Sequence, residues 1–177
     1  RILALLFLVL AFAQPYTGSI GDSGTTNDSL ISLYIDNSNS MSAKGINGEL
    51  LSQAKSNAKE IVSQFPANQK FIIASNELNG IQERTLNQQD ALLEIEQIKY
   101  TPVQRNINTI LNWQREMFTK EKKVNKNLNK VNYIILSDFQ KDFFRLDNIK
   151  KDNEGQYNMI QIQPQSKSNC FVDSVWF

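Results

Sequence analysis

The sequence of 177 residues contains no histidine and a single cysteine, Cys170. Without histidine the chain cannot form a Ser-His-Asp triad, and it lacks the most common general base and a usual zinc ligand. One cysteine cannot form an intrachain disulfide. Hydrolytic and zinc-dependent chemistry are therefore disfavoured before any motif is considered.

An excess of charge of one sign is also missing. The chain has 19 Lys and Arg against 18 Asp and Glu, which gives a net charge of +1. Because no bulk field attracts a polyanion, we do not expect a nucleic-acid partner. The basic, Asn-rich stretch 120–130 is the local exception, and we interpret it as a solvated helix end and loop.

Long apolar runs are scarce, and the longest one, ILALLFLVLAFA, covers residues 2–13. It is shorter than the ~20 residues that span a bilayer. It is either a signal-peptide h-region, with Ala11-Phe12-Ala13 as the cleavage site, or the end of a transmembrane helix. Both interpretations place the following domain outside the cytoplasm. A buried helix of the domain is a third interpretation, which the lack of a polar face disfavours.

Residues 14–29, rich in glycine and small polar residues, predict a linker.

The rest of the chain alternates apolar runs with amphipathic segments. This pattern predicts an α/β fold with a doubly wound, mostly parallel sheet and helices on both faces. We expect one domain over 30–165, followed by a further strand or the start of another domain at 166–177. The predicted strands are 30–36, 71–74, 131–136 and 157–162, with a short edge strand at 81–86 and one more at 171–177. The predicted helices are 47–65, 88–98, one that opens at Thr101-Pro102 and runs beyond Phe118, and 139–151.

Two of the predicted strands end in an aspartate. Asp36 follows the first strand and begins a D-x-S-x-S pattern with Ser38 and Ser40, and Asp138 follows the strand 131–136. In a doubly wound sheet the strand ends at the order reversal surround one crevice, so these oxygens are expected to converge. Such oxygens suit Mg²⁺, Mn²⁺ or Ca²⁺. The alternative is that they only satisfy loop amides and cap the next helix.

The sequence DNSNSM after an apolar strand, with LSDF after a later one, resembles the von Willebrand factor type A domain over about residues 30–165. The resemblance implies a Rossmann-like fold and a metal-ion-dependent adhesion site with Asp36, Ser38, Ser40 and Asp138 as ligands. The family supplies a further threonine from the loop before its third helix. Counting back from the predicted helix puts Gln104 or Arg105 at that position, and Thr101 is the alternative.

A narrower resemblance is to the membrane-anchored BatA-type proteins of the bacterial aerotolerance group. It rests on the segment LVLAFAQPY, a short linker and the LSDFQ motif. It implies that residues 1–13 end a second transmembrane helix. It also implies that the domain lies on the periplasmic side of the bacterial inner membrane.

These resemblances imply a membrane-anchored binding module and not an enzyme. A partner's acidic side chain would complete the coordination of the metal, and we expect Asn37, Asn39, Gln104 and Arg105 to contact that partner. One alternative is a metal-free scaffold in which Arg105 replaces the charge of the cation. Another is a Mg²⁺-dependent phosphotransferase with Asp36 as nucleophile. The serine at position 38, where that chemistry usually has a second acid, and the lack of a Gly-rich phosphate loop disfavour it.

Overall fold

The computed structural model describes residues 29–140 and 155–165. The predictions for the apolar segment 1–13, the linker, most of the helix 139–151 and the strand 171–177 lie outside these residues. Within the described ranges, no helix is both long and apolar enough to cross a membrane.

Four parallel strands form the central sheet in the order β4-β1-β5-β6. They are β1 (Ser29–Ile35), β4 (Lys70–Ala74), β5 (Lys130–Ser137) and β6 (Gly155–Gln161). The chain runs from β1 to β4 on one side and then crosses to β5 on the other. The order therefore reverses between β1 and β5, which is where open α/β sheets bind ligands.

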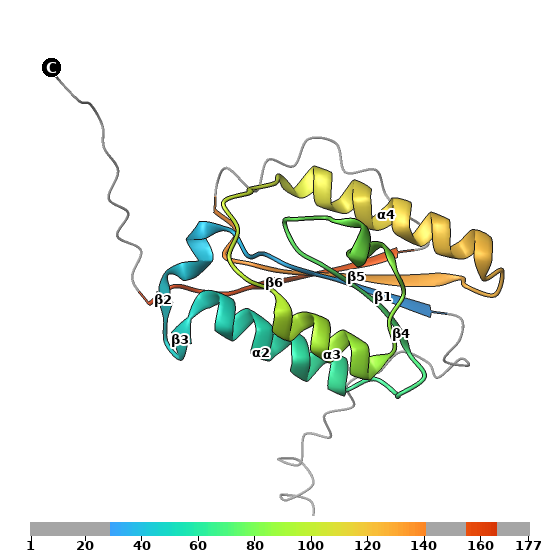
Figure 1. The fold of residues 1–177 in the computed structure, drawn as a ribbon, viewed down its shortest axis with the longest axis horizontal. Helices are drawn as coiled ribbons and strands as arrows, with labels where there is room; N and C mark the ends of the chain where they lie inside the picture. The colour runs from blue at the N-terminus through green and yellow to red at the C-terminus, as the bar shows by residue number, and fades with distance from the viewer. Residues whose placement is uncertain (1–28, 141–154, 166–177) are drawn as a thin grey trace, which may run out of the picture.

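Helices cover both faces of the sheet, as the alternating pattern predicts (Figure 1). On one face lie α2 (Leu50–Ser63) and α3 (Gln88–Gln97), and on the other lies α4 (Ile107–Val124). The side chains of β1 alternate between the two layers. Ile31 and Leu33 pack in the core under α2 and α3, while Leu30 and Tyr34 pack against α4. This double burial is why β1 is a nearly continuous apolar run.

The helix predicted over 47–65 begins later than expected, because the residues before it form a hairpin. The strands β2 (Lys44–Gly45) and β3 (Gly48–Glu49) pair in antiparallel fashion, and α2 begins directly after them at Leu50. Gly48 has a φ of 104°, a conformation that residues with a side chain rarely adopt. The turn chemistry thus overrides the helical periodicity at this end.

The helix expected to open at Thr101-Pro102 is also corrected, since α4 begins at Ile107. Its N-cap is Asn106, whose side chain accepts a hydrogen bond from the Thr109 amide at 2.9 Å. Val103, expected in the apolar face of this helix, is 40% exposed. Residues 98–106 form a connecting loop, which we call the 98–106 loop.

The edge strand predicted over 81–86 is replaced by the 3-10 helix η2 (Gly80–Glu83). Only Leu86 pairs with the sheet, through an antiparallel bridge to Phe71. The strands predicted at 30–36, 71–74, 131–136 and 157–162 and the helix predicted at 88–98 are confirmed, with ends that differ by at most two residues.

Candidate metal centre

The topology brings the two aspartates to neighbouring strand ends. Asp36 follows β1 and Asp138 follows β5, and Ile35 lies opposite Leu136 in the register. The Asp36 amide continues the ladder by donating to the Leu136 carbonyl at 2.9 Å. Ser38 and Ser40 enter the same region through the short helix η1 (Asn39–Ser42). The sequence-predicted convergence of these four residues is therefore present.

Internal hydrogen bonds fix the carboxylate of Asp36. Its Oδ1 accepts from the Ser38 amide and from Asn76 Nδ2, both at 2.9 Å. Its Oδ2 accepts from the Ser137 hydroxyl at 2.7 Å. The residue is only 2% exposed. Three donors hold the carboxylate in one orientation, since hydrogen bonds to a charged acceptor are the stronger kind.

The other three candidate ligands form a chain of adjacent oxygens. Ser38 Oγ and Ser40 Oγ lie 3.1 Å apart and share a hydrogen bond, and Ser40 also hydrogen-bonds to the Asp138 side chain. Burial raises the pKa of the Asp138 carboxyl, the bond from Ser40 acts in the opposite direction, and the charge of Asp36 raises it further. In the described part of the chain, neither aspartate forms an ion pair with a lysine or arginine.

This donor set fits a hard divalent cation. Two hydroxyls and a carboxylate from Ser38, Ser40 and Asp138 would hold it, with Asp36 beside them, and oxygen is what Mg²⁺, Mn²⁺ and Ca²⁺ prefer. A positive ion would also relieve the repulsion between the two carboxylates. The described residues contain no group of three or more His, Cys, Asp or Glu side chains able to hold a metal. A metal here would therefore depend on the serine hydroxyls.

The 98–106 loop lies against the D-x-S-x-S segment through Thr101. The Thr101 amide donates to the Asn37 carbonyl at 3.0 Å, and its hydroxyl accepts from the Val103 amide at 3.3 Å. Gln104 is exposed. Arg105 Nε donates to the Asn76 carbonyl at 2.5 Å, and its guanidinium also reaches the Glu77 carbonyl at 3.4 Å. Of the three candidates for the family's threonine position, Thr101 is the one bonded to the motif.

The four residues predicted to contact a partner differ in their exposure. Asn39 and Gln104 are exposed, and Arg105 is half-buried. Asn37 is 1% exposed. Its side-chain Nδ2 donates to the Lys99 carbonyl at 2.6 Å, and its Oδ1 accepts from the backbone N–H of Asn76 at 3.0 Å. Asn37 thus links the D-x-S-x-S segment to two other loops, which is a positioning role.

Asn76 and the hydroxyl of Ser137 are parts of the site that the sequence analysis missed. Asn76 follows β4, and its side chain joins Asp36 to the buried Tyr34 hydroxyl, which donates to Asn76 Oδ1 at 2.7 Å. The signal was present, because Ser75-Asn76 directly follows an apolar strand, as Asp36 and Asp138 do. Nothing in the pattern distinguished that strand end from an ordinary loop.

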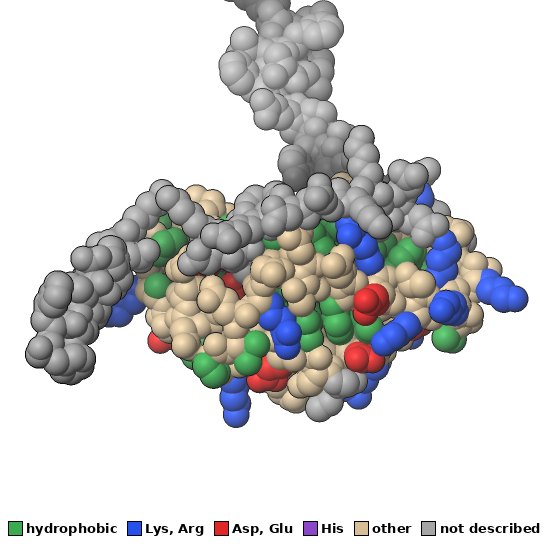
Figure 2. Space-filling view, turned by 90° about the horizontal axis from the view of Figure 1, so that it is seen from above, with side chains coloured by type: hydrophobic (Ala, Val, Ile, Leu, Met, Phe, Trp, Pro, Cys, Tyr) green, Lys and Arg blue, Asp and Glu red, His purple; other side chains and the backbone are tan. Residues whose placement is uncertain are grey.

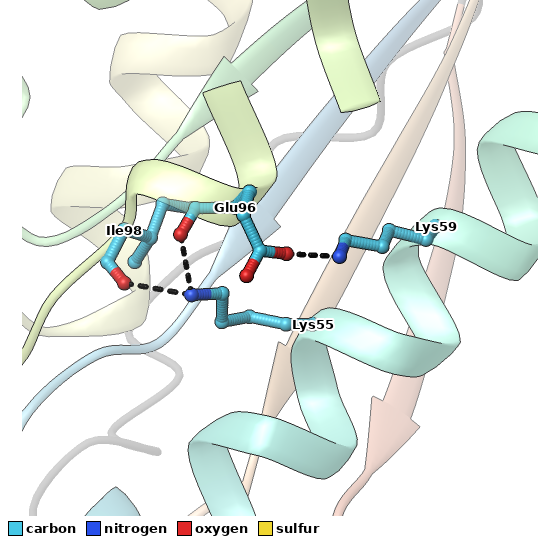
Figure 3. Close-up of polar contacts among 4 residues, drawn as sticks. All are labelled: Lys55, Lys59, Glu96 and Ile98. Atoms are coloured by element: carbon cyan, nitrogen blue, oxygen red, sulfur yellow. Dashed lines mark hydrogen bonds and ion pairs between the residues drawn. The ribbon is translucent and has the colours of Figure 1, made fainter. Parts of the chain in front are cut away.

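The helix layer below the sheet fixes the start of the 98–106 loop. Lys55 of α2 points at the carboxyl end of α3, where its ammonium donates to the carbonyls of Glu96 at 2.6 Å and Ile98 at 3.1 Å (Figure 3). One turn further along α2, Lys59 pairs with the Glu96 carboxylate. The next residue after Ile98 is Lys99, whose carbonyl binds Asn37. The end of α3 is therefore connected to the candidate metal centre.

Comparison with models of known protein families found no match for this sequence. A comparison with curated proteins found no match either. The chemistry of the site therefore has to be inferred from its own oxygen atoms and their surroundings.

Proposed function

We propose that the chain is a membrane-anchored protein-binding module of the von Willebrand factor A type. It binds a divalent cation at Asp36, Ser38, Ser40 and Asp138, and through that ion a carboxylate of a protein partner. The supporting observation is the chain of oxygens at the order reversal of the sheet, in which Ser38 Oγ hydrogen-bonds to Ser40 Oγ and Ser40 hydrogen-bonds to the Asp138 side chain.

The small number of carboxylates at the site favours a partner of acidic character. A divalent cation held by one or two carboxylates and two hydroxyls retains positive charge and takes further oxygen ligands. Ser40 is half-exposed, and Asn39 and Gln104 beside the site are exposed. A Glu or Asp side chain of a partner supplies both the charge and the missing ligand.

The placement of Arg105 favours a metal over the metal-free scaffold. Its guanidinium donates to the carbonyls of Asn76 and Glu77, and in the described part of the chain it forms no ion pair with either aspartate. It therefore supports the Asn76 segment and does not occupy the position of a cation. The same geometry disfavours Asp36 as a nucleophile, because both of its oxygens accept internal hydrogen bonds.

The membrane anchor is the second part of the proposal. Its support is the apolar composition of residues 2–13 and the linker-like segment that separates them from β1. The resemblance to BatA-type proteins supports a position of the domain on the periplasmic side of a bacterial inner membrane.

Calorimetric titration of Mg²⁺ and Mn²⁺ into the 177-residue chain in detergent micelles tests the metal. We expect saturable binding at one site, weakened at least tenfold in Asp138→Asn and in Ser40→Ala. Glu116→Gln, which removes an exposed carboxylate of α4, is the matched control and should bind as the parent chain does. A folded parent chain that binds no divalent cation would contradict the proposal.

Matched peptides test the partner chemistry. A set of short peptides with a central Glu, each paired with its Gln counterpart, is screened against the chain with Mn²⁺ or with EDTA. We expect binding that needs both Glu and metal and that is lost in Asp138→Asn. Binding that persists in EDTA and in the variant would instead support the metal-free scaffold.

A further inference from the structure

Lysines gather at the edge of the sheet opposite the candidate metal centre. Ser29 at the start of β1 pairs with Lys130, and the next residue pairs with Lys70, so both lysines lie at the amino ends of neighbouring strands. The carboxyl end of α4 packs over the same edge, because Phe118 contacts the core cluster of Leu30. We call Lys70, Lys122, Lys123, Val124, Lys126 and Lys130 the amino-end surface.

The amino-end surface combines positive charge with an exposed apolar side chain. Val124 is 84% exposed, and Lys123 and Lys126 are exposed on either side of it. Figure 2 shows Lys and Arg side chains collected at this end of the molecule, at the right of the view. Within residues 120–130, Glu121 is the acidic residue. Glu83 also lies close to this stretch, but its charge is paired with Lys120 at 3.1 Å. The field of the surface is therefore positive.

This composition suits a lipid surface better than a nucleic acid. Lysines attract anionic headgroups, and an aliphatic side chain among them enters the boundary of the acyl chains. Proteins that bind nucleic acid add arginines and exposed aromatic rings for stacking, and the amino-end surface has neither. The aromatic rings next to this surface are buried: Phe71 follows Lys70 in β4, and Phe118 lies beneath Lys122.

The chain connectivity indicates which membrane the amino-end surface would contact. β1 begins at this edge with Ser29, and residues 14–28 join it in sequence to the apolar segment 2–13. The fifteen residues 14–28 can span at most roughly 50 Å even when fully extended. If the apolar segment lies in a bilayer, the amino-end surface stays within reach of the headgroups.

We propose that the amino-end surface docks on the anionic headgroups of the membrane that the chain's own anchor enters. The carboxyl edge of the sheet, with Asp36 and Asp138, then faces away from the bilayer and toward a protein partner. This inference rests on the anchoring part of the proposed function and is independent of the metal.

Fluorescence quenching in nanodiscs tests the docking. The full chain carries Cys170→Ser and one labelled cysteine. The label is either at Asn127→Cys, an exposed position between α4 and β5 beside the amino-end surface, or at Gln104→Cys, exposed near the opposite edge. The discs contain phosphatidylcholine alone or with phosphatidylglycerol, plus a headgroup-attached quencher. We expect quenching at position 127 in the anionic discs that 0.5 M salt reverses, and little quenching at position 104.

Charge-removing variants identify the residues responsible. Lys123→Gln and Lys126→Gln should each reduce the ratio of docked to undocked chain about fivefold, the effect of one lysine near an anionic surface. Lys44→Gln is the matched control, because it removes an exposed lysine from the hairpin after β1 and should leave the ratio unchanged.

Four outcomes would overturn the proposal. Equal quenching at position 127 in neutral and anionic discs would remove the electrostatic basis, and no quenching in either would remove the docking. Tight binding of an RNA duplex without quenching would assign the surface to nucleic acid. Alkaline carbonate extraction of membranes tests the anchor separately. Release of the chain would refute the anchor and therefore the docking. The result of the Mn²⁺ titration does not depend on this outcome.

Discussion

Asn76 shows how one side chain holds a site together. Its amide N–H donates to Asn37, its carbonyl accepts from Arg105, and its side chain bonds to Tyr34 and Asp36. All four polar groups of this buried residue are used. The segments they join lie far apart in the sequence, so the loss of this one amide affects the whole carboxyl edge of the sheet.

Asn76→Ala is expected to lower the free energy of unfolding by about 2–4 kcal/mol. The substitution removes the hydrogen bond that the buried Tyr34 hydroxyl donates to Asn76 and a donor to the buried Asp36 carboxylate, and losing buried hydrogen bonds is costly. Urea denaturation followed by tryptophan fluorescence measures the change. Asn39→Ala, at an exposed position of the D-x-S-x-S segment, should change stability by less than about 0.5 kcal/mol. A similar small change for Asn76→Ala would show that the network carries little energy.

We expect the ionisation of Tyr100 to lower the free energy of unfolding at alkaline pH. Burial and a hydrogen bond to Glu49 at 2.7 Å raise the pKa of its phenol to about 12. The folded state therefore holds this proton more tightly than the unfolded state. The stabilisation is complete below pH 10 and is lost as the pH rises from about 10 to 12.

In Tyr100→Phe this part of the alkaline decline should disappear. Absorbance at 295 nm should also show one tyrosine fewer titrating near pH 12. The measurement is the difference in tyrosine absorbance between the parent chain and the variant across the titration. If the variant lost a transition near pH 10 and not near pH 12, the pKa of the Tyr100 phenol would not be raised.

Among the elements, α2 supports the end of α3, and α3 supports the 98–106 loop. Lys55 supplies a positive charge and two hydrogen bonds at the carboxyl end of α3, where helical carbonyls lack partners. In the loop that follows, the Lys99 carbonyl accepts from the Asn37 side chain and the Thr101 amide donates to the Asn37 carbonyl. The packing of two helices therefore influences the position of a loop at the candidate metal centre.

Lys55→Met should lower the free energy of unfolding by about 1 kcal/mol and loosen this loop. The Thr101 amide, which donates to Asn37, should then exchange with solvent faster. Lys59→Met is the matched control on the same helix and should have a smaller effect, since its ion pair with Glu96 is exposed. Hydrogen exchange and urea denaturation of both variants measure the difference, and equal effects would contradict the special role of Lys55.

At the scale of the whole molecule, the sheet separates two charged regions. The candidate metal centre lies at the carboxyl ends of β1 and β5, and the amino-end surface lies at the other ends. The seven residues of β1 span about 23 Å at 3.3 Å per residue. This distance exceeds the screening length of about 8 Å at physiological salt. The two regions should therefore act independently.

Combining variants tests this independence. Asp138→Asn should weaken Mn²⁺ binding without changing quenching at position 127. The pair Lys123→Gln and Lys126→Gln should do the reverse. The triple variant should show both effects at their separate sizes, because distant sites without shared partners are additive. A coupling greater than about 0.5 kcal/mol would indicate that the domain transmits a change from one edge to the other.

The sequence predicted the elements well wherever burial controls the pattern. The runs 30–36 and 131–136 are apolar because helices cover both sides of the sheet, and that double burial is visible in composition alone. It failed where local turn chemistry competes with periodicity. The hairpin at 44–49 and the late start of α4 at Ile107 depend on Gly48 and on the Asn106 cap, which a helical repeat does not reveal.

Local sequence patterns are sufficient to predict which residues can meet at the candidate site. Asp36 and Asp138 each end a buried strand, and parallel strands place their carboxyl ends on one edge. How these side chains are held depends instead on contacts between distant parts of the chain. Asn76 binds Asp36 across 40 residues, Ser137 binds it across 101, and Arg105 is directed to the Asn76 carbonyl. Such bonds depend on strand order, loop path and side-chain direction together, and no local pattern encodes all three.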